Sequence, residues 1–274
     1  MKPNFLIIMS DEHGPMFSGT YGHPIVKTPN MDRIAKEGTT FDAAYCNSPL
    51  CVPSRASFMT GKYNHKVGVY DGSSPLAVDA ITWPYLLRDQ GYHVALSGKM
   101  HLVEPDPLHG FEEQLSEDVH LSHSKLPVQM WEKGITTELP PMSKKNADSL
   151  LTGAGAGTNM YIEADNATEE AAVQFLENPS RHDSPWALCV GFLAPHFPFV
   201  VPEPYFSMYY PDNVDLPNIP DGHLENLPES AKRLLASFNM TGANPPEYTA
   251  KARAAYYGQV TWMDKKIGKL LATL

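Results

Sequence analysis

The stretch CNSPLCVPSR holds two of the three cysteines of this chain of 274 residues, Cys46 and Cys51. Pro53 favours the first turn of a helix and Gly61 favours its end, so Cys51 is expected at or just before a helix N-terminus. The helix dipole there favours an anion and therefore a thiolate. The alternative is a buried, inert cysteine. A zinc site is disfavoured because no second pair of ligands follows.

Other polar side chains follow apolar runs of the sequence. Asp11 and Glu12 come after FLIIM, Lys99 and His101 after HVALS, and His196 after WALCVGFL. Carboxylates bind hard divalent cations, and lysine and histidine bind anions or move protons. Lys99 and His101 lie two apart, so in an extended segment both point to the same side. Asp11, Lys99, His101 and His196, at the ends of these runs, are the first indication of a functional site.

The elements that must position these residues can be read from the apolar pattern. Short apolar runs at residues 5–9, 92–97 and 186–193 are typical of strands buried on both faces. Helix signals, including caps, prolines and glycines, fall at residues 28–38, 82–91, 166–178 and 246–274. The alternation indicates an α/β fold with a mostly parallel central sheet and helices on both faces. Ligands bind at the carboxyl ends of such strands, where the polar candidates lie.

Two long segments give weaker signals. Residues 195–246 hold ten of the 25 prolines and are expected to form a surface excursion without regular elements, which could wall a pocket. Residues 102 to about 160 are polar and are expected to be mostly loop. Within them, GAGAG at 153–157 lacks the preceding strand and the lysine of a phosphate-binding loop.

The composition argues against some classes of binding partner. The net charge of −10 offers no basic stripe for nucleic acid or an anionic membrane. No apolar segment has the length of a signal peptide core or a membrane span, and an odd number of cysteines fits a reducing compartment. We therefore expect a cytoplasmic protein with no nucleic-acid or membrane partner.

Several of these motifs together resemble the sulfatase family of the alkaline-phosphatase-like superfamily. CVPSR followed by ASFMTG resembles the family's Cys-X-Pro-Ser-Arg signature, NFLIIMSDE its first strand and TPNMDRIAKEG its first helix. SGKMH resembles its lysine and histidine pair, and APHFPF its later histidine. The stretches SPLCVPSRASFMTG, SGKMHL and LHGFEE are most similar to the choline-sulfatase and phosphonate monoester hydrolase side of the family.

The resemblance implies a specific chemistry. A formylglycine-generating enzyme would oxidise Cys51 to formylglycine, whose hydrated aldehyde attacks the sulfur of a small sulfate ester and later releases sulfate. Arg55 would orient the hydroxyls, Lys99 and His101 would hold the sulfate, and His196 would protonate the leaving oxygen. A divalent cation, Ca²⁺ first with Mg²⁺ or Mn²⁺ as alternatives, would be bound by Asp11, Glu12 and the residue at Cys51.

Two features of the family have no counterpart in the sequence: an Asp-His or Asp-Asn loop that completes the metal site, and a later lysine. Residues 1–274 are therefore expected to be the N-terminal portion of a single sulfatase-like catalytic domain. A sheet lacking a central strand would leave an open edge, which favours pairing with another chain to form a homo-oligomer.

Three functional hypotheses remain open. The first is a metal-assisted, formylglycine-dependent hydrolase of sulfate esters. The second is hydrolysis of phosphonate or phosphate esters by the same site, and the third is a truncated, inactive sulfatase-like protein. The substrate alcohol is not indicated by the sequence, since no cluster of aromatic residues suggests a site for a quaternary ammonium group.

Overall fold

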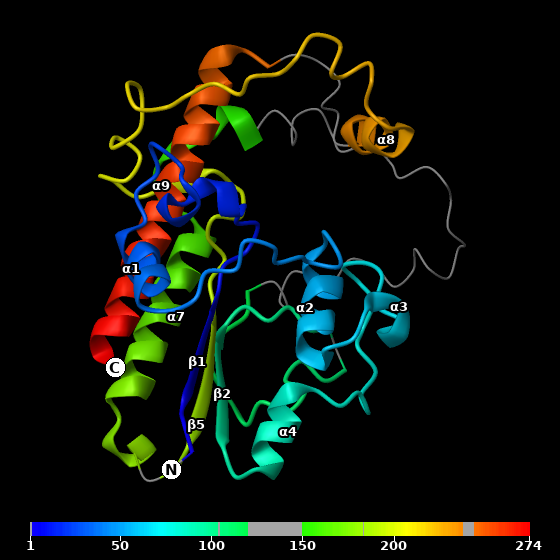
Figure 1. Ribbon diagram of the computed structural model, residues 1–274, viewed down its shortest axis with the longest axis vertical. Coiled ribbons are helices and arrows are strands. Elements are labelled where there is room, and N and C mark those ends of the chain that lie inside the picture. Colours follow the sequence, from blue (N-terminus) through cyan, green and yellow to red (C-terminus); the bar gives the residue numbers. More distant parts are fainter. Residues whose placement is uncertain (1, 104, 120–149, 183, 238–243) are drawn as a thin grey trace.

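A parallel sheet of four strands forms the centre of the computed structural model, which describes all residues except 1, 104, 120–149, 183 and 238–243 (Figure 1). In spatial order the strands are β1 (Phe5–Met9), β5 (Trp186–Gly191), β2 (His93–Gly98) and β3 (Glu113–Ser116). Every residue of β5 is buried, as expected of a strand paired on both sides. The three strands predicted from apolar runs are confirmed, and β3 lies in the segment expected to be loop.

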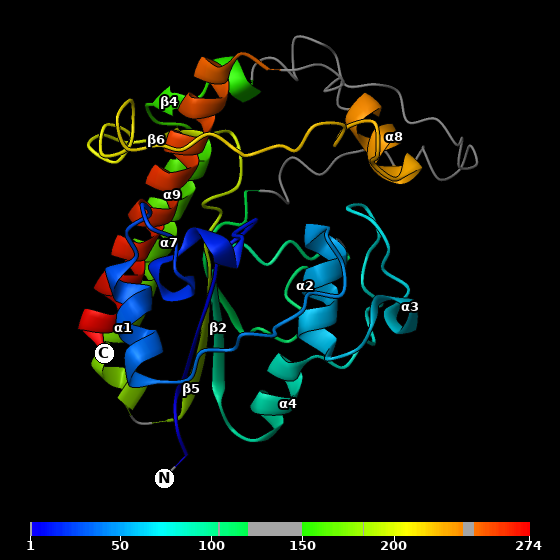
Figure 2. The same ribbon diagram turned by 45° about the horizontal axis from the view of Figure 1, so that its top comes forward.

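One face of the sheet is covered by α7 (Met160–Glu177) and α9 (Pro246–Thr273), with α1 (Pro29–Glu37) packed against α9. Figures 1 and 2 show α7 and α9 side by side along this face. Phe175 and Leu176 from α7 and Met263 and Leu270 from α9 lie in the same buried cluster as Leu188 of β5. The amphipathic pattern therefore buries one face of each helix against the sheet.

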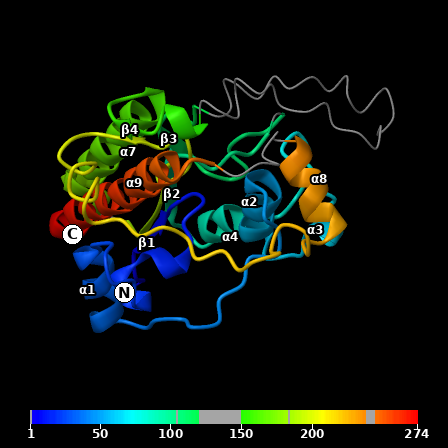
Figure 3. The ribbon, with the colours of Figure 1, turned by 90° about the horizontal axis from the view of Figure 1, so that it is seen from above.

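The other face carries α2 (Cys51–Thr60) and α4 (Trp83–Asp89), with the short α3 (Asn64–Val67) beside α2. Met59 from α2 and Leu87 from α4 pack in a cluster with Leu96 of β2 and Cys189 of β5. Seen from above, α7 and α9 lie on one side of β1 and β2, and α2 and α4 lie on the other (Figure 3). This arrangement confirms the predicted α/β architecture with helices on both faces.

The predicted start of α7 at Asn166 is wrong. The helix begins at Met160, and the side chain of Asn159 caps it by accepting hydrogen bonds from the backbone N–H groups of Tyr161 at 2.9 Å and Ile162 at 3.0 Å. Asn166 lies inside the helix and accepts a hydrogen bond from Lys266 Nζ at 2.7 Å. Asn159 and Asn166 can both cap a helix, and both precede regularly spaced apolar residues. Sequence alone therefore does not choose between them.

The segment 195–246 is more ordered than its prolines suggest. It holds β6 (Val200–Val201), which pairs in parallel with β4 (Gly155–Ala156), and the exposed helix α8 (Glu229–Ser237). Val201 and Tyr209 are fully buried, so this part is not purely a surface excursion. Short 3₁₀ turns complete the described elements: η1 (Pro15–Phe17), η2 (Gly19–Tyr21) and η3 (Pro179–His182).

Candidate active site

Three predicted site residues meet beyond the carboxyl ends of β1 and β2. The ammonium group of Lys99 donates a hydrogen bond to Asp11 Oδ2, and Cys51 Sγ lies 3.6 Å from the same oxygen. Lys99 Nζ is 3.8 Å from Cys51 Sγ. Lys99 is 1% exposed and Asp11 6% exposed, so the contact is shielded from water. The acid, the lysine and the cysteine are separated by tens of residues in sequence and are brought together by the sheet and α2.

Arg55 completes this cluster from the first turns of α2. Its Nη2 lies 3.3 Å from Asp11 Oδ1, and its Nη1 donates a hydrogen bond to the backbone oxygen of Lys99 at 2.8 Å. Burial raises the pKa of Asp11, but the charges of Lys99 and Arg55 outweigh it and lower that pKa to about 2. Asp11 is therefore a carboxylate at every physiological pH, held between two buried cations.

The environment of Cys51 opposes a thiolate. Cys51 is the first residue of α2, as predicted, but burial and the negative charge of Asp11 raise the pKa of its thiol. Lys99 and Arg55 act in the opposite direction and do not compensate. A helix N-terminus favours a thiolate, but desolvation and the neighbouring carboxylate act against the thiolate at this position. As a plain cysteine, this residue carries a protonated thiol.

His196 reaches the same cluster from the loop after β5. Ligand atoms of Asp11, Cys51 and His196 all lie within 4.8 Å of one another. Nε2 of His196 is 3.5 Å from Oε1 of Glu12, whose backbone has a left-handed φ of 58°. The Tyr256 hydroxyl holds this strained turn by donating a hydrogen bond to the Glu12 carbonyl at 2.8 Å. The carboxylate of Glu12 is therefore directed toward His196.

His101 lies near the cluster with an unusual backbone. Its φ is 54°, a backbone angle that residues with a Cβ rarely adopt. Burial, together with the positive charges of Lys99 and Arg55, lowers the pKa of His101 to about 4. The ring is therefore neutral at neutral pH, and it offers a hydrogen bond to an anion rather than a full charge.

Sequence reasoning missed the residues that hold the loops of the site. Asp118 accepts hydrogen bonds from the backbone of the turn after β2, and Asp165 does the same for the turn after β5. Gln259 of α9 donates to backbone oxygens of residues 196, 198 and 200 at 3.1 to 3.4 Å. Asp and Gln in polar or helical stretches carry no local signal of such a role, so only the tertiary contacts reveal them.

The donor set fits one side of a divalent cation site. Asp11 offers a deprotonated carboxylate, with atoms of Cys51 and His196 close by. Glu12 adds a second carboxylate next in sequence, although its side chain faces His196. Hard cations such as Ca²⁺ take six to eight oxygen ligands. The residues that the structure describes therefore account for part of a coordination sphere.

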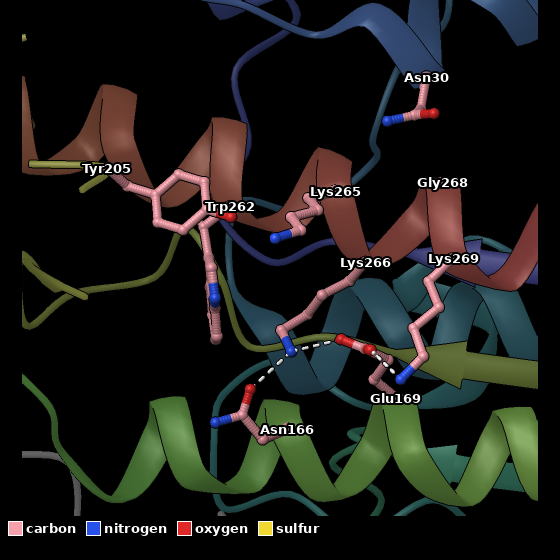
Figure 4. Close-up of a pocket in the computed structure, with 9 residues that line it drawn as sticks. All are labelled: Asn30, Asn166, Glu169, Tyr205, Trp262, Lys265, Lys266, Gly268 and Lys269. Carbon is pink, nitrogen blue, oxygen red and sulfur yellow. Dashed lines mark hydrogen bonds and ion pairs between the residues drawn. The ribbon is translucent and has the colours of Figure 1, made fainter. Parts of the chain in front are cut away.

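A separate pocket of about 560 Å³ lies between α7 and α9 and contains none of the predicted site residues (Figure 4). Its polar wall is an ion-pair network: Lys266 and Lys269 both contact Glu169, at 2.6 and 2.8 Å. Lys266 also lies 4.4 Å from the ring centroid of Trp262. The carboxylate of Glu169 is paired with both lysines, so the network has a structural role in joining the two helices.

The Sulfatase family model matches residues 3–274, almost the whole chain. This chain belongs to the sulfatase family. Over its full length it is 33% identical to a choline-sulfatase of Rhizobium meliloti strain 1021 and 30% identical to an arylsulfatase of Clostridium perfringens. It covers 54% and 60% of these proteins, respectively, so the chain spans about half the length of the curated relatives it matches.

Solved structures share the sulfatase fold seen here. The phosphonate monoester hydrolase of Agrobacterium radiobacter matches 100% of the chain with a TM-score of 0.71 at 24% identity, and the chain covers 59% of it. At this identity the match shows the fold alone. In the part of the chain that the structure describes, no helix combines the length and apolar character that crossing a bilayer requires.

Proposed function

We propose that this site hydrolyses sulfate esters with a nucleophile derived from Cys51. The observation that carries the proposal is the contact of the signature cysteine with the deprotonated Asp11 and the buried Lys99, while Arg55 binds the other oxygen of Asp11. The raised pKa of the thiol makes plain Cys51 a poor nucleophile at neutral pH. Conversion of Cys51 to formylglycine by a formylglycine-generating enzyme would supply a hydrated aldehyde hydroxyl in its place.

The side chains of this chain have distinct roles in the proposed reaction. Arg55 and Lys99, buried beside residue 51, orient the attacking group and neutralise charge that develops on sulfate oxygens. His101 donates a hydrogen bond to the sulfate. His196 donates a proton to the oxygen of the leaving alcohol, the step that a histidine performs at neutral pH.

Asp11 is the first candidate ligand of a divalent cation, with Glu12 and the group at position 51 as further ligands. The carboxylate chemistry favours Ca²⁺, with Mg²⁺ and Mn²⁺ as alternatives. Such an ion would polarise a sulfate oxygen and lower the pKa of the attacking hydroxyl. Asp11 is suited to this because it stays ionised in a buried position.

Residues 1–274 are, in this proposal, the N-terminal portion of one catalytic domain, as the coverage of the relatives supports. The three cysteines are free, which fits a reducing, cytoplasmic compartment. β1 is an edge strand of the described sheet and is paired only with β5. Pairing of that edge with a second copy of the chain stays a prediction.

Hydrolysis of phosphonate or phosphate monoesters is a second candidate. The same buried cations and carboxylate would serve both reactions, because both esters carry anionic oxygens on the central atom. Turnover of a sulfate monoester and a phosphonate monoester with the same alcohol separates the two. A higher kcat/KM for the phosphonate would reject the sulfatase assignment, and no turnover of either would favour an inactive sulfatase-like protein.

Mass spectrometry of the peptide that contains residue 51 tests the proposed nucleophile. Protein from the native host should show the mass of formylglycine at position 51, and Cys51→Ala should abolish hydrolysis while the protein stays folded. An unmodified thiol in active protein from that host would contradict the proposal. Cys46→Ala is the matched control and should retain activity, because Cys46 is exposed and outside the cluster.

A further inference from the structure

Two turns of the site are held in the same way by buried carboxylates. In the turn after β2, Oδ2 of Asp118 accepts hydrogen bonds from the backbone N–H groups of Met100 at 2.9 Å and His101 at 2.6 Å. In the turn after β5, the two oxygens of Asp165 accept from Leu193 at 2.7 Å and Ala194 at 2.9 Å. Each carboxyl group therefore binds two consecutive backbone N–H groups, at His101 itself in the first turn and two residues before His196 in the second.

These carboxylates are almost inaccessible to water. Asp118 is 2% exposed and Asp165 1% exposed. A buried carboxyl group is unfavourable unless hydrogen bonds satisfy it, so an apolar residue would fill either position at lower cost if packing were its only task. What each position requires is an acceptor able to bind two N–H groups at once.

We propose that Asp118 and Asp165 are positioning residues of the active site, with Asp165 fixing the general acid His196 and Asp118 fixing the sulfate-binding pair Lys99 and His101. This inference rests on the proposed function, because it divides the steps of that reaction between the two turns. Neither carboxylate touches the substrate in this proposal.

Asp165 acts on His196 through the backbone. The N–H of His196 donates to the Leu193 carbonyl at 2.9 Å, and the N–H of Asp11 donates to the Ala194 carbonyl at 3.3 Å. The two residues held by Asp165, Leu193 and Ala194, therefore contact the backbone of both the general acid and the metal-binding residue. One turn earlier on α7, Tyr161 packs edge-on against the His196 ring, with centroids 5.8 Å apart. Thus α7 supports both the backbone and the ring of His196.

Asp118 acts on a strained turn. His101 has a left-handed φ of 54°, which is strained for a residue with a Cβ. Two hydrogen bonds to one oxygen of Asp118 stabilise that conformation. The Lys99 carbonyl, at the start of the same turn, accepts a hydrogen bond from Arg55. Loss of the Asp118 contact would therefore disturb both groups that hold the sulfate.

The two roles predict different kinetic signatures. Protonation by His196 matters most for alcohols that leave poorly, and little for a phenol that leaves easily as an anion. Sulfate binding by Lys99 and His101 matters equally for alkyl sulfates and for phenyl sulfates. Asp165→Asn should therefore lower kcat/KM about 10- to 100-fold for an alkyl sulfate, the loss expected for a misplacement near 1 Å, and much less for 4-nitrophenyl sulfate. Asp118→Asn should lower both to a similar extent.

Asp264→Asn is the matched control. Asp264 is 1% exposed, and its carboxylate accepts from the consecutive N–H groups of Asn30 at 3.1 Å and Met31 at 2.8 Å at the start of α1, away from the site residues. All three variants keep the size of the side chain and replace one acceptor oxygen with a donor. A general loss of stability would reduce the activity of all three alike, with no dependence on the leaving group.

Hydrogen exchange supplies a readout that does not depend on activity. In full-length protein, Asp165→Asn should accelerate exchange of the Leu193 and Ala194 amides, and Asp118→Asn that of Met100 and His101. Asp264→Asn should affect neither pair. Equal kinetic losses for both substrates in Asp165→Asn, or unchanged exchange at these amides, would overturn the inference. Wild-type protein that hydrolyses no sulfate or phosphonate ester would reject the proposed function, and hydrogen exchange alone would then decide whether the carboxylates fix these turns.

Discussion

At the scale of single residues, burial and neighbouring charges set the protonation states of the site. Asp11 is ionised because two buried cations contact it, whereas the thiol of Cys51 is kept protonated by burial and by that same carboxylate. Burial, with Asp11 as a second cause, therefore opposes the thiolate that a helix N-terminus favours.

Thiol labelling tests this description in protein produced without conversion of Cys51. Cys46 is exposed, whereas full burial raises the pKa of Cys189 to about 12 and burial raises that of Cys51. At neutral pH, iodoacetamide should modify Cys46 first and leave the other two cysteines largely unmodified, because the thiolate is the reactive form. Peptide mapping by mass spectrometry measures the order, and faster labelling of Cys51 than of Cys46 would contradict the raised pKa.

At the scale of elements, the close approach of β2 and β5 at their carboxyl ends determines where Lys99 lies. Gly98 has a φ of 78°, and the N–H of Lys99 donates to the Gly191 carbonyl at 2.8 Å. A Cβ added at Gly191 would lie 1.9 Å from the Lys99 carbonyl oxygen. Because Gly98 and Gly191 carry no Cβ, the two strands can approach this closely and Lys99 can reach the site.

Gly191→Ala should therefore destabilise the protein by about 2 kcal/mol or more, since backbone atoms cannot move aside without separating the strands. It should also reduce activity by displacing Lys99. Urea unfolding gives the change in free energy. Gly72→Ala is the control, because nothing lies within 4 Å of an added Cβ there, and its stability should change by less than about 0.5 kcal/mol. Equal stability of both variants would disprove the close-contact argument.

At the scale of the whole molecule, ion pairs between α7 and α9 join the long C-terminal helix to the part that carries the site. Lys266 is 4% exposed and donates to both Asn166 and Glu169 (Figure 4). Lys269 contacts the other oxygen of Glu169, but its side chain is 55% exposed. The same carboxylate therefore has one buried and one solvated partner.

This difference gives a matched pair of variants. Lys266→Met should cost about 2 to 4 kcal/mol of unfolding free energy, because it removes a buried partner of a largely buried carboxylate. Lys269→Met should cost less than about 1 kcal/mol, as exposed ion pairs do. Denaturant titrations of both variants measure the difference. A larger loss for Lys269→Met would contradict the assignment of Lys266 as the structural partner.

The pH dependence of the free energy of unfolding should report the titration of Asp165. Burial raises the pKa of Asp165 from its ordinary value of 3.8 to about 7 in the folded protein. Such a group contributes stability below the unfolded pKa, and this contribution is lost as the pH rises toward 7. Relative to Asp165→Asn, the wild type should therefore lose about 2 kcal/mol between pH 5 and pH 8.

Urea unfolding at several pH values measures this loss. Glu170→Gln removes an exposed carboxylate from the same helix and controls for the general effect of one charge. A wild type that gains stability relative to Asp165→Asn over this range would reverse the sign and reject the raised pKa.

The sequence by itself determined the α/β architecture, the three apolar strands, the helix that begins at Cys51 and the identity of the candidate residues. These follow from local rules, since burial periodicity and caps act over a few neighbouring positions. It did not predict β3, the start of α7 at Met160, or the order within residues 195–246, where tertiary packing outweighs weak local signals.

Only the tertiary structure decided the electrostatics of the site. That Asp11 lies between Lys99 and Arg55, that Glu12 faces His196, and that Asp118 and Asp165 hold the flanking turns all depend on contacts between distant segments. Charge interactions and desolvation act through space, so no spacing along the chain encodes them. The sequence indicates which residues are available for chemistry, and the fold determines which of them are charged, which are neutral and which are held in place.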